Sequence, residues 1–370
     1  MQIPLFKPCF PEATRQNITR DIDDILTTGK LMMGPHKDAL EAAMCEASAS
    51  PHAVSVNTCT TALTICLKHF GAQDSEVLVP SGTFLTSVSS IIFAGGTPVL
   101  VDMNPETLSF DLEDLKRKLS PRTKGMVWVH LTGVISPEYK KILAFAKNNG
   151  LFIIEDCAHA LGARVPEGPA GSLGDAGCFS FYPTKIVTSG TGGVLTTKHS
   201  DLAHYAVKMR IFCKDPETQA IDGLGNDWFL DEIRACVAHH QLALLDEQLM
   251  RRRAIAAAYD AALANTPGLR LLSLPEGNLS SYYQYPVFLD EGIDHAALAK
   301  VLKDIHGVQA KKIYIPTHEE VCFRGLDDGT LGQTTRTLHS SLCLPVYVTM
   351  TDEEISAVTN GLQTELASLR

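Results

Sequence analysis

The chain has 370 residues, of which 45% are hydrophobic, 20% charged and 7% aromatic, as in an ordinary soluble globular protein. At this length one core is not expected, so two domains are the starting assumption. The formal net charge of −10 argues against a protein that coats nucleic acid or an anionic membrane surface. We interpret the three consecutive arginines at 251–253 as a solvated helix face.

Ten cysteines are scattered along the chain without a C-x-x-C pair. Several, such as Cys66 and Cys236, lie within apolar runs, where a reduced thiol packs as a small hydrophobic group. This usage indicates a reducing compartment, so the expected localisation is cytoplasmic. No basic segment followed by an apolar one opens the sequence, and no apolar run is long enough to predict a membrane span.

From about residue 53 to residue 197, short apolar runs alternate with stretches of helical spacing. The short runs predict strands because they are rich in Val and Ile and bounded by Gly, Pro or Asp, at 52–56, 76–80, 97–102, 124–130, 151–156, 177–181 and 192–197. The stretches between them predict helices, at 60–71, 83–96, 109–119 and 136–150. The alternation favours an α/β fold with a largely parallel sheet covered by helices.

After about residue 228 the pattern changes. Residues 229–265 predict a long helix with few breaks that leads out of the large domain. The remainder mixes predicted strands with predicted helices and favours a smaller α+β domain, with strands at 281–289 and 307–315 and helices at 294–306 and 351–369. We therefore expect a large domain at 1–245 and a small C-terminal domain at 246–370.

Lys185 lies between an apolar run and a cluster of glycines, in the segment CFSFYPTKIVTSGTGG at 178–193. A buried ammonium is costly unless it is paired, neutralised or used covalently, so this lysine needs a partner. Ligands of open α/β sheets bind at the carboxyl ends of strands, and one strand ends in Glu155 and Asp156. Neighbouring side chains of a strand point to opposite faces, so only one of these acids can enter a given site. A helix-capping role for Asp156 is an equally good interpretation from the sequence alone.

Two further segments could contact a ligand. Thr58, Cys59 and Thr60 stand between a strand and a helix, where free backbone N–H groups can hold an anion, although capping explains the threonines equally well. Phe84 follows a strand and a turn, where its ring could stack on a flat ligand, although a role in the core is commoner. The glycines at 190, 192 and 193 precede a strand, whereas the dinucleotide-binding fingerprint follows one, so they predict a turn with positive φ angles.

Taken in order, these segments resemble the DegT-type (DegT/DnrJ/StrS) sugar aminotransferases, which are pyridoxal 5′-phosphate (PLP) enzymes with the type I aminotransferase fold. The resemblance covers nearly the whole chain, from LTTGKLMMGPHKDALEAAM and VNTCTTAL through VLVPSGTFLTSVSSIIFAGGTPVLVD, VHLTG and IIEDCAHALGA, and is strongest at GDAGCFSFYPTK and SGTGG. It implies a large PLP-binding domain with a mostly parallel seven-stranded sheet and a smaller C-terminal α+β domain.

The resemblance also implies roles for the catalytic residues. Lys185 would form a Schiff base with PLP and, once released, would move the proton of the amino donor. Asp156 would face the pyridine nitrogen and keep it protonated, so that the ring can accept electrons. His159 would lie near the phenolic oxygen of the ring or near the substrate.

The same resemblance implies which side chains bind the cofactor. Phe84 would stack on the PLP ring. Ser180 and the corner formed by Cys59 and Thr60 would hold the phosphate, with Cys59 standing where a glycine is usual. No metal is expected.

Other positions depart from the family pattern. An asparagine that reaches the phosphate of the neighbouring subunit is replaced by Asp227, whose carboxylate a phosphate would repel, and a nearby arginine is replaced by Phe229. We therefore expect Asn226 to make the phosphate contact after a small shift of the loop. Met32 and Met33 replace threonines of a segment that the family uses around its substrate.

The resemblance places three residues near the substrate. These are Met33, Thr132, which replaces a tyrosine, and His318, for which a capping or surface role is equally open.

The expected activity is transfer of an amino group from an amino acid, with glutamate favoured, to a keto-sugar in amino-sugar biosynthesis, with a nucleotide-linked sugar favoured. Alternatives within the fold are a non-nucleotide keto-sugar, or dehydration, epimerisation or oxidation at the same cofactor. Relatives that dehydrate carry histidine at the lysine position, so Lys185 favours amino transfer. A non-catalytic PLP-binding regulatory protein is a further alternative. The resemblance also implies a homodimer with shared active sites.

Overall fold

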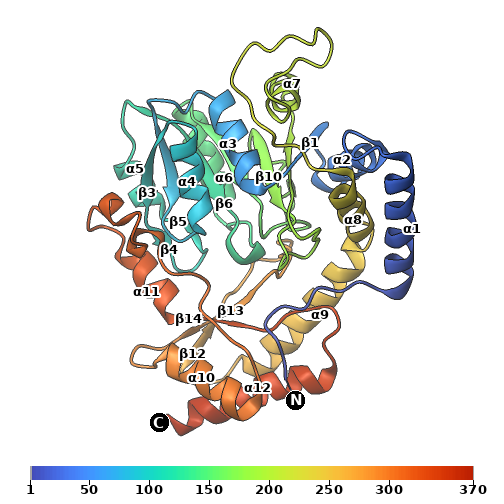
Figure 1. Cartoon of the computed structure of the whole chain (residues 1–370). Helices are drawn as coiled ribbons and strands as arrows, with labels where there is room; N and C mark the ends of the chain where they lie inside the picture. The colour runs from blue at the N-terminus through green and yellow to red at the C-terminus, as the bar shows by residue number, and fades with distance from the viewer. Residues whose placement is uncertain (1, 370) are drawn as a thin grey trace.

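The computed structural model describes residues 2–369, and its largest element is a seven-stranded sheet in the order β1-β11-β10-β7-β6-β2-β3 (Figure 1). Its strands are β1 (His52–Val56), β2 (Glu76–Pro80), β3 (Thr97–Val101), β6 (Thr123–Val129), β7 (Phe152–Asp156), β10 (Ala176–Ser180) and β11 (Gly193–Thr197). The strands from β10 to β3 pair in parallel, and β11 is antiparallel to both of its neighbours. The predicted seven strands and the mostly parallel sheet are therefore confirmed.

The large sheet is covered on both faces because its side chains alternate between two cores. In β6, Met126 and Trp128 pack in one core, whereas Val127 and Val129 pack in the other. The first core is completed by α2 (Pro35–Ser48), α5 (Leu112–Arg117), α6 (Tyr139–Asn148) and α8 (Glu232–Leu242), and the second by α3 (Cys59–His69), α4 (Leu85–Phe93) and α7 (Ser200–Met209). The helix α1 (Glu12–Thr28) packs along α8.

The smaller C-terminal domain is built on an antiparallel sheet in the order β12-β13-β14 (Figure 1). Its elements are β12 (Leu269–Leu271), β13 (Tyr285–Leu289), α10 (His295–His306), α11 (Gly332–Ser340), β14 (Ser341–Leu344) and α12 (Asp352–Ser368). The helix α9 (Leu245–Leu263) contributes Leu249 to a core of the large domain and Tyr259 to the core of the small one. It therefore connects the two domains, and we keep the division between residues 245 and 246 as a proposal.

The remaining elements are short and lie in connections. They are β4 (Met103–Asn104), β5 (Ser109–Phe110), β8 (Arg164–Val165), β9 (Gly168–Pro169) and the 3₁₀ turns η1 (Leu131–Gly133), η2 (Thr317–Glu319) and η3 (Arg324–Leu326). Within residues 2–369 we find no helix that combines the length and the apolar character needed to cross a bilayer.

The interpretation of the arginines at 251–253 as a solvated helix face is wrong, because Arg252 is buried and donates to the backbone oxygens of Tyr282 and Val346. Two predicted elements also differ in the structure. The long helix predicted at 229–265 is divided into α8 and α9 by a break at Ala243 and Leu244, which lets α8 pack on α1 and α2 while α9 reaches the small domain. The strand predicted at 307–315 does not form. Its backbone makes isolated bridges, from Val308 to Ile3 and from Lys311 to Cys343, because two different segments share it as a partner.

Candidate active site

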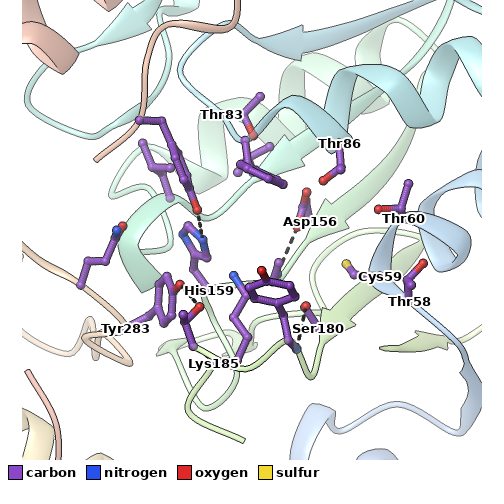
Figure 2. A pocket seen from close by; sticks show the side chains of 18 of the residues that line it. Thr58, Cys59, Thr60, Thr83, Thr86, Asp156, His159, Ser180, Lys185 and Tyr283 are labelled. Carbon is purple, nitrogen blue, oxygen red and sulfur yellow. Dashed lines mark hydrogen bonds between the residues drawn. The ribbon is translucent and has the colours of Figure 1, made fainter. Parts of the chain in front are cut away.

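A cavity of about 550 Å³ opens at the carboxyl ends of the parallel strands, and both Lys185 and Asp156 line it (Figure 2). Its other walls come from the first turns of α3 and α4 and from segments of the small domain, with Thr58, Cys59, Thr60, Phe84, His159, Ser180, Tyr283, Gln284, Lys311 and Tyr314 among the lining residues. The site therefore lies where the sheet topology places ligands, and both domains contribute to it.

Asp156 is the acid of the pair that enters the cavity, whereas Glu155 points to the opposite face. One carboxylate oxygen of Asp156 accepts the hydroxyl of Ser87 at 2.7 Å, and the other accepts the N–H of Ala158 at 3.0 Å. Glu155 is fully buried and pairs with His130 at 2.7 Å while accepting three backbone N–H groups. The alternation predicted for these two acids is confirmed, and Asp156 is held in one orientation with lone pairs available to a ligand.

The amine of Lys185 lies 4.4 Å from the ring centre of Tyr283. Loss of hydration in the cavity lowers the pKa of Lys185 to about 8, even though the negative charge of Asp156 opposes this shift. About a tenth of the amine is therefore neutral at pH 7, compared with less than a thousandth for an exposed lysine. A lysine in this state can act as a nucleophile near neutral pH.

His159 is held as a neutral imidazole of defined tautomer. Burial lowers its pKa well below the usual value, and the charges of Lys185 and Lys311 add to the effect. Its Nδ1 accepts the backbone N–H of Thr132 at 3.1 Å, so its Nε2 carries the hydrogen and donates to the hydroxyl of Tyr314 at 2.8 Å. The hydroxyl hydrogen of Tyr314 is then free to reach an acceptor in the cavity.

The start of α3 forms an anion-binding corner. The N–H groups of Cys59 and Thr60 are the first two of the helix and have no intrahelical acceptor, and both residues line the cavity with Ser180. A Cβ on Gly193 would meet the backbone of Thr58 and Cys59 at 2.5 Å, so only glycine lets β11 approach this corner. The turn before it uses positive φ angles at Gly190 and Gly192, as predicted, whereas Gly193 begins β11 without a positive φ.

These groups fit PLP. The phosphate matches the free N–H groups at the start of α3 together with the Ser180 hydroxyl, the pyridine nitrogen matches the carboxylate of Asp156, and the aldehyde matches the amine of Lys185. Phe84 lines the same cavity, half-exposed, with its ring 5.3 Å from that of Tyr314, where it can cover a flat ligand.

Four residues that the sequence analysis placed near the cofactor or substrate do not line this cavity. Thr132 is buried with φ of 61°, a costly angle for a branched residue, and contributes its N–H to His159 instead. Both ring nitrogens of His318 are used, with Ser81 at 2.6 Å and Thr335 at 3.1 Å. Met33 lies in the turn before α2. Asn226 lies in an exposed loop beside a separate depression.

Four further residues line the cavity although no pattern in the sequence indicated them, namely Tyr283, Tyr314, Lys311 and Gln284. All four lie in segments that were predicted as strands: Tyr283 and Gln284 in 281–289, of which only Tyr285–Leu289 forms β13, and Lys311 and Tyr314 in 307–315, which forms no strand. No local pattern distinguishes these side chains from those of a half-buried strand, so their role depends on how the two domains pack. Ser87 was missed because it lies inside a helix, where a serine has no spacing signature.

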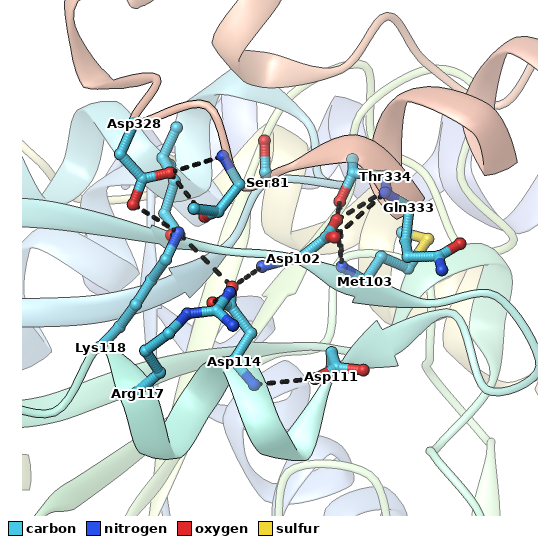
Figure 3. Close-up of polar contacts among 12 residues, drawn as sticks. Ser81, Asp102, Met103, Asp111, Asp114, Arg117, Lys118, Asp328, Gln333 and Thr334 are labelled. Carbon is cyan, nitrogen blue, oxygen red and sulfur yellow. Dashed lines mark hydrogen bonds and ion pairs between the residues drawn. The ribbon is translucent and has the colours of Figure 1, made fainter.

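His318 has a structural role, since it ties the segment of Lys311 and Tyr314 to the large domain. The next helix, α11, has no capping side chain of its own, and Asp102 caps it from the end of β3 (Figure 3). Asp102 accepts the N–H groups of Gln333 at 3.0 Å and Thr334 at 2.7 Å, and the hydroxyl of Thr334 at 2.7 Å. These buried hydrogen bonds fix the start of α11, which lies behind the segment of Lys311 and Tyr314.

The chain matches the model of the DegT/DnrJ/EryC1/StrS aminotransferase family over residues 12–363. It is 34% identical to GDP-perosamine synthase from Caulobacter vibrioides over 325 residues, which are 84% of this chain and 85% of that protein. The crystal structure of the aminotransferase TlmJ from Streptoalloteichus hindustanus is similar with a TM-score of 0.92 at 30% identity over 100% of both chains. The structure of DesI in the presence of its TDP-sugar product has a TM-score of 0.92 at 29% identity, covering 100% of this chain and 94% of that one.

We predict that Asp102→Ala lowers the free energy of unfolding by about 2–4 kcal/mol, because it leaves buried donors of α11 without an acceptor. Asp111→Ala is the matched control, since Asp111 caps α5 at a partly exposed site and its loss should cost about 1 kcal/mol. Chemical denaturation of both variants measures the difference. Equal losses would show that Asp102 is an ordinary surface cap.

We also predict how the uptake of PLP by the apoprotein depends on pH. Only the neutral amine reacts, so with a pKa near 8 the rate at Lys185 should rise about tenfold per pH unit below pH 8 and level off above it. Measuring Nα-acetyl-lysine under the same conditions removes the titration of PLP itself. The ratio of the protein rate to this reference should be constant below pH 8 and fall above it. A ratio that stays constant to pH 10 contradicts the lowered pKa.

Proposed function

Because the chain belongs to the DegT/DnrJ/EryC1/StrS aminotransferase family, we propose that it moves an amino group from glutamate to a nucleotide-linked keto-sugar. The chain is a PLP-dependent transaminase, and its relatives act in amino-sugar biosynthesis. The observation that carries the proposal is a lysine with a lowered pKa that lines the same cavity as a fixed carboxylate and the open start of a helix.

In the proposed mechanism, Lys185 anchors the coenzyme and then, as a free amine, moves a proton from the α-carbon of the donor. Asp156, oriented by Ser87, holds a proton on the pyridine nitrogen. When bound, PLP supplies the carbonyl carbon that takes the amino group and a ring that accepts electrons. The start of α3 and Ser180 would hold the phosphate and so keep the coenzyme oriented toward Lys185.

Two relatives support a nucleotide-linked acceptor. GDP-perosamine synthase is named for a nucleotide-linked sugar, and DesI was solved with its TDP-sugar product. We infer that the acceptor here belongs to the same class, with its reacting carbon at Lys185 and its nucleotide outside the cavity. A non-nucleotide keto-sugar remains the second candidate. The retained Lys185 favours amino transfer over dehydration.

We further propose a homodimer with shared active sites. Asn226 borders a depression that Thr58 and Thr60 also line, on the outer side of the phosphate corner. Near it, Leu224 is 96% exposed and Phe93 is 63% exposed, which is unfavourable for two large apolar side chains in a free chain. A second copy that covers them would bring its own Asn226 toward this corner.

The activity is tested in two half-reactions. With PLP bound, L-glutamate should remove the yellow colour and release one equivalent of 2-oxoglutarate, and a nucleotide-linked keto-sugar should then restore the colour. Lys185→Met should lower the rate by about a thousandfold or more, because both the anchor and the proton carrier are lost. A wild-type protein that keeps its colour with every amino acid would support a regulatory PLP-binding protein instead.

Shared sites are tested by mixing two inactive subunits. If Lys185 and Asn226 act in one site from different chains, Lys185→Met and Asn226→Ala subunits refolded together should form hybrids with one intact site. Equal mixing should then recover about a quarter of the wild-type activity. If mass spectrometry shows that hybrids form but activity does not recover, then either both residues act in a site within one chain or Asn226 is not part of the site.

A further inference from the structure

Lys311 is a cation that the proposed mechanism does not use. Among the described side chains that line the cavity, Asp156 is the one acid, and Lys185 and Lys311 are the cations. Lys185 is assigned to the coenzyme and Asp156 to its ring nitrogen. No ion pair within residues 2–369 includes Lys311, which lies exposed at the mouth of the cavity.

A series of aromatic rings links the ammonium of Lys311 to the groups around Lys185. It lies 5.3 Å from the ring centre of Phe6, which stacks on Tyr283 with 5.5 Å between centres. Tyr283 in turn contacts His159, with 4.2 Å between ring centres, and carries the amine of Lys185 above its ring. The charge of Lys311 reaches both groups, since it contributes to the lowered pKa values of His159 and Lys185.

A second unsatisfied group belongs to a residue that lines the same cavity. Gln284 is 3% exposed, and its side-chain oxygen is buried without a hydrogen-bond partner. Rotation of the amide would present its NH₂ group instead, so Gln284 can serve either a hydroxyl or a carboxylate oxygen. Gln284 and Lys311 thus line one cavity, the first with a buried oxygen that has no partner and the second with no ion-pair partner among the described residues, which indicates that a polar ligand can bind there.

We propose that Lys311 binds the α-carboxylate of the amino donor, with Gln284 as a second contact. This inference rests on the proposed function. The α-carboxylate is attached to the carbon that reacts at Lys185, so it must lie close to the reacting groups, where the charge of Lys311 is felt. An ammonium and a carboxylate form a charge-assisted hydrogen bond, and the match removes the repulsion that Lys311 exerts on Lys185 in the free site.

The neighbouring lysine provides a matched control. The amine of Lys312 lies 3.0 Å from Nδ1 of His339, and Lys312 is not among the residues that line the cavity. Lys311→Met and Lys312→Met therefore remove the same charge from adjacent positions, but only the first removes it from the site.

The experiment measures binding to the PLP-loaded protein from the change in coenzyme absorbance. The probes are L-glutamate, α-methyl-L-glutamate, which has no α-proton and binds without turnover, and 4-aminobutyrate, which lacks the α-carboxylate. In Lys311→Met we expect dissociation constants about 10- to 100-fold higher for both glutamates, with the limiting rate for glutamate changed less than about threefold. Binding of 4-aminobutyrate should not change, and Lys312→Met should behave as wild type.

Three results would overturn the assignment of Lys311. They are unchanged affinity for α-methyl-L-glutamate, an equal loss for 4-aminobutyrate, and an effect confined to the reaction with the keto-sugar, which would assign Lys311 to an anion of the acceptor. A wild-type protein that binds α-methyl-L-glutamate but does not convert glutamate would contradict the proposed transamination while leaving Lys311 testable. Failure of the Lys311 assignment and failure of the proposed transamination therefore give different results.

Discussion

The site depends on the removal of water from one ammonium group. Lys185 occupies a cavity whose sole acidic lining residue, within the described part of the chain, is Asp156, and that carboxylate already accepts two hydrogen bonds. Desolvation therefore outweighs attraction, and the pKa falls to about 8. If Glu155 faced the same cavity, a second negative charge would favour the ammonium form. The alternation of side chains along β7 is thus what keeps the amine reactive.

The other groups of the site are held by backbone geometry. The start of α3 is brought to the cavity by close approach of β11, which Gly193 permits. Thr132 adopts a left-handed conformation that costs about 1–2 kcal/mol and aims its N–H at His159. That hydrogen bond selects the tautomer, which in turn orients Tyr314. The geometry of the anion-binding corner and the tautomer of His159 are therefore set by the backbone before any ligand binds.

The small domain completes the site from the opposite side. The segment of Lys311 and Tyr314 has no continuous strand partner, so its position depends on contacts at its end, where His318 bridges Ser81 and Thr335. Asp102 fixes α11 behind it. The placement of a cation at the cavity therefore depends on polar contacts between the domains, made by residues that do not line the cavity themselves.

The sequence by itself determined the strands of the large sheet, the placement of Glu155 and Asp156 on opposite faces and the glycine turn after Lys185. These features follow from local rules, because side chains alternate along a strand, glycine adopts positive φ angles, and parallel strands present their carboxyl ends together. The resemblance added the pairing of Lys185 with Asp156. Only the tertiary structure decided that His318 supports the wall rather than lining it, that Thr132 contributes its backbone, and that Lys311, Tyr283 and Gln284 face the cavity. Those positions result from the packing of one domain against another, and the identity of neighbouring residues in the chain carries no information about that packing.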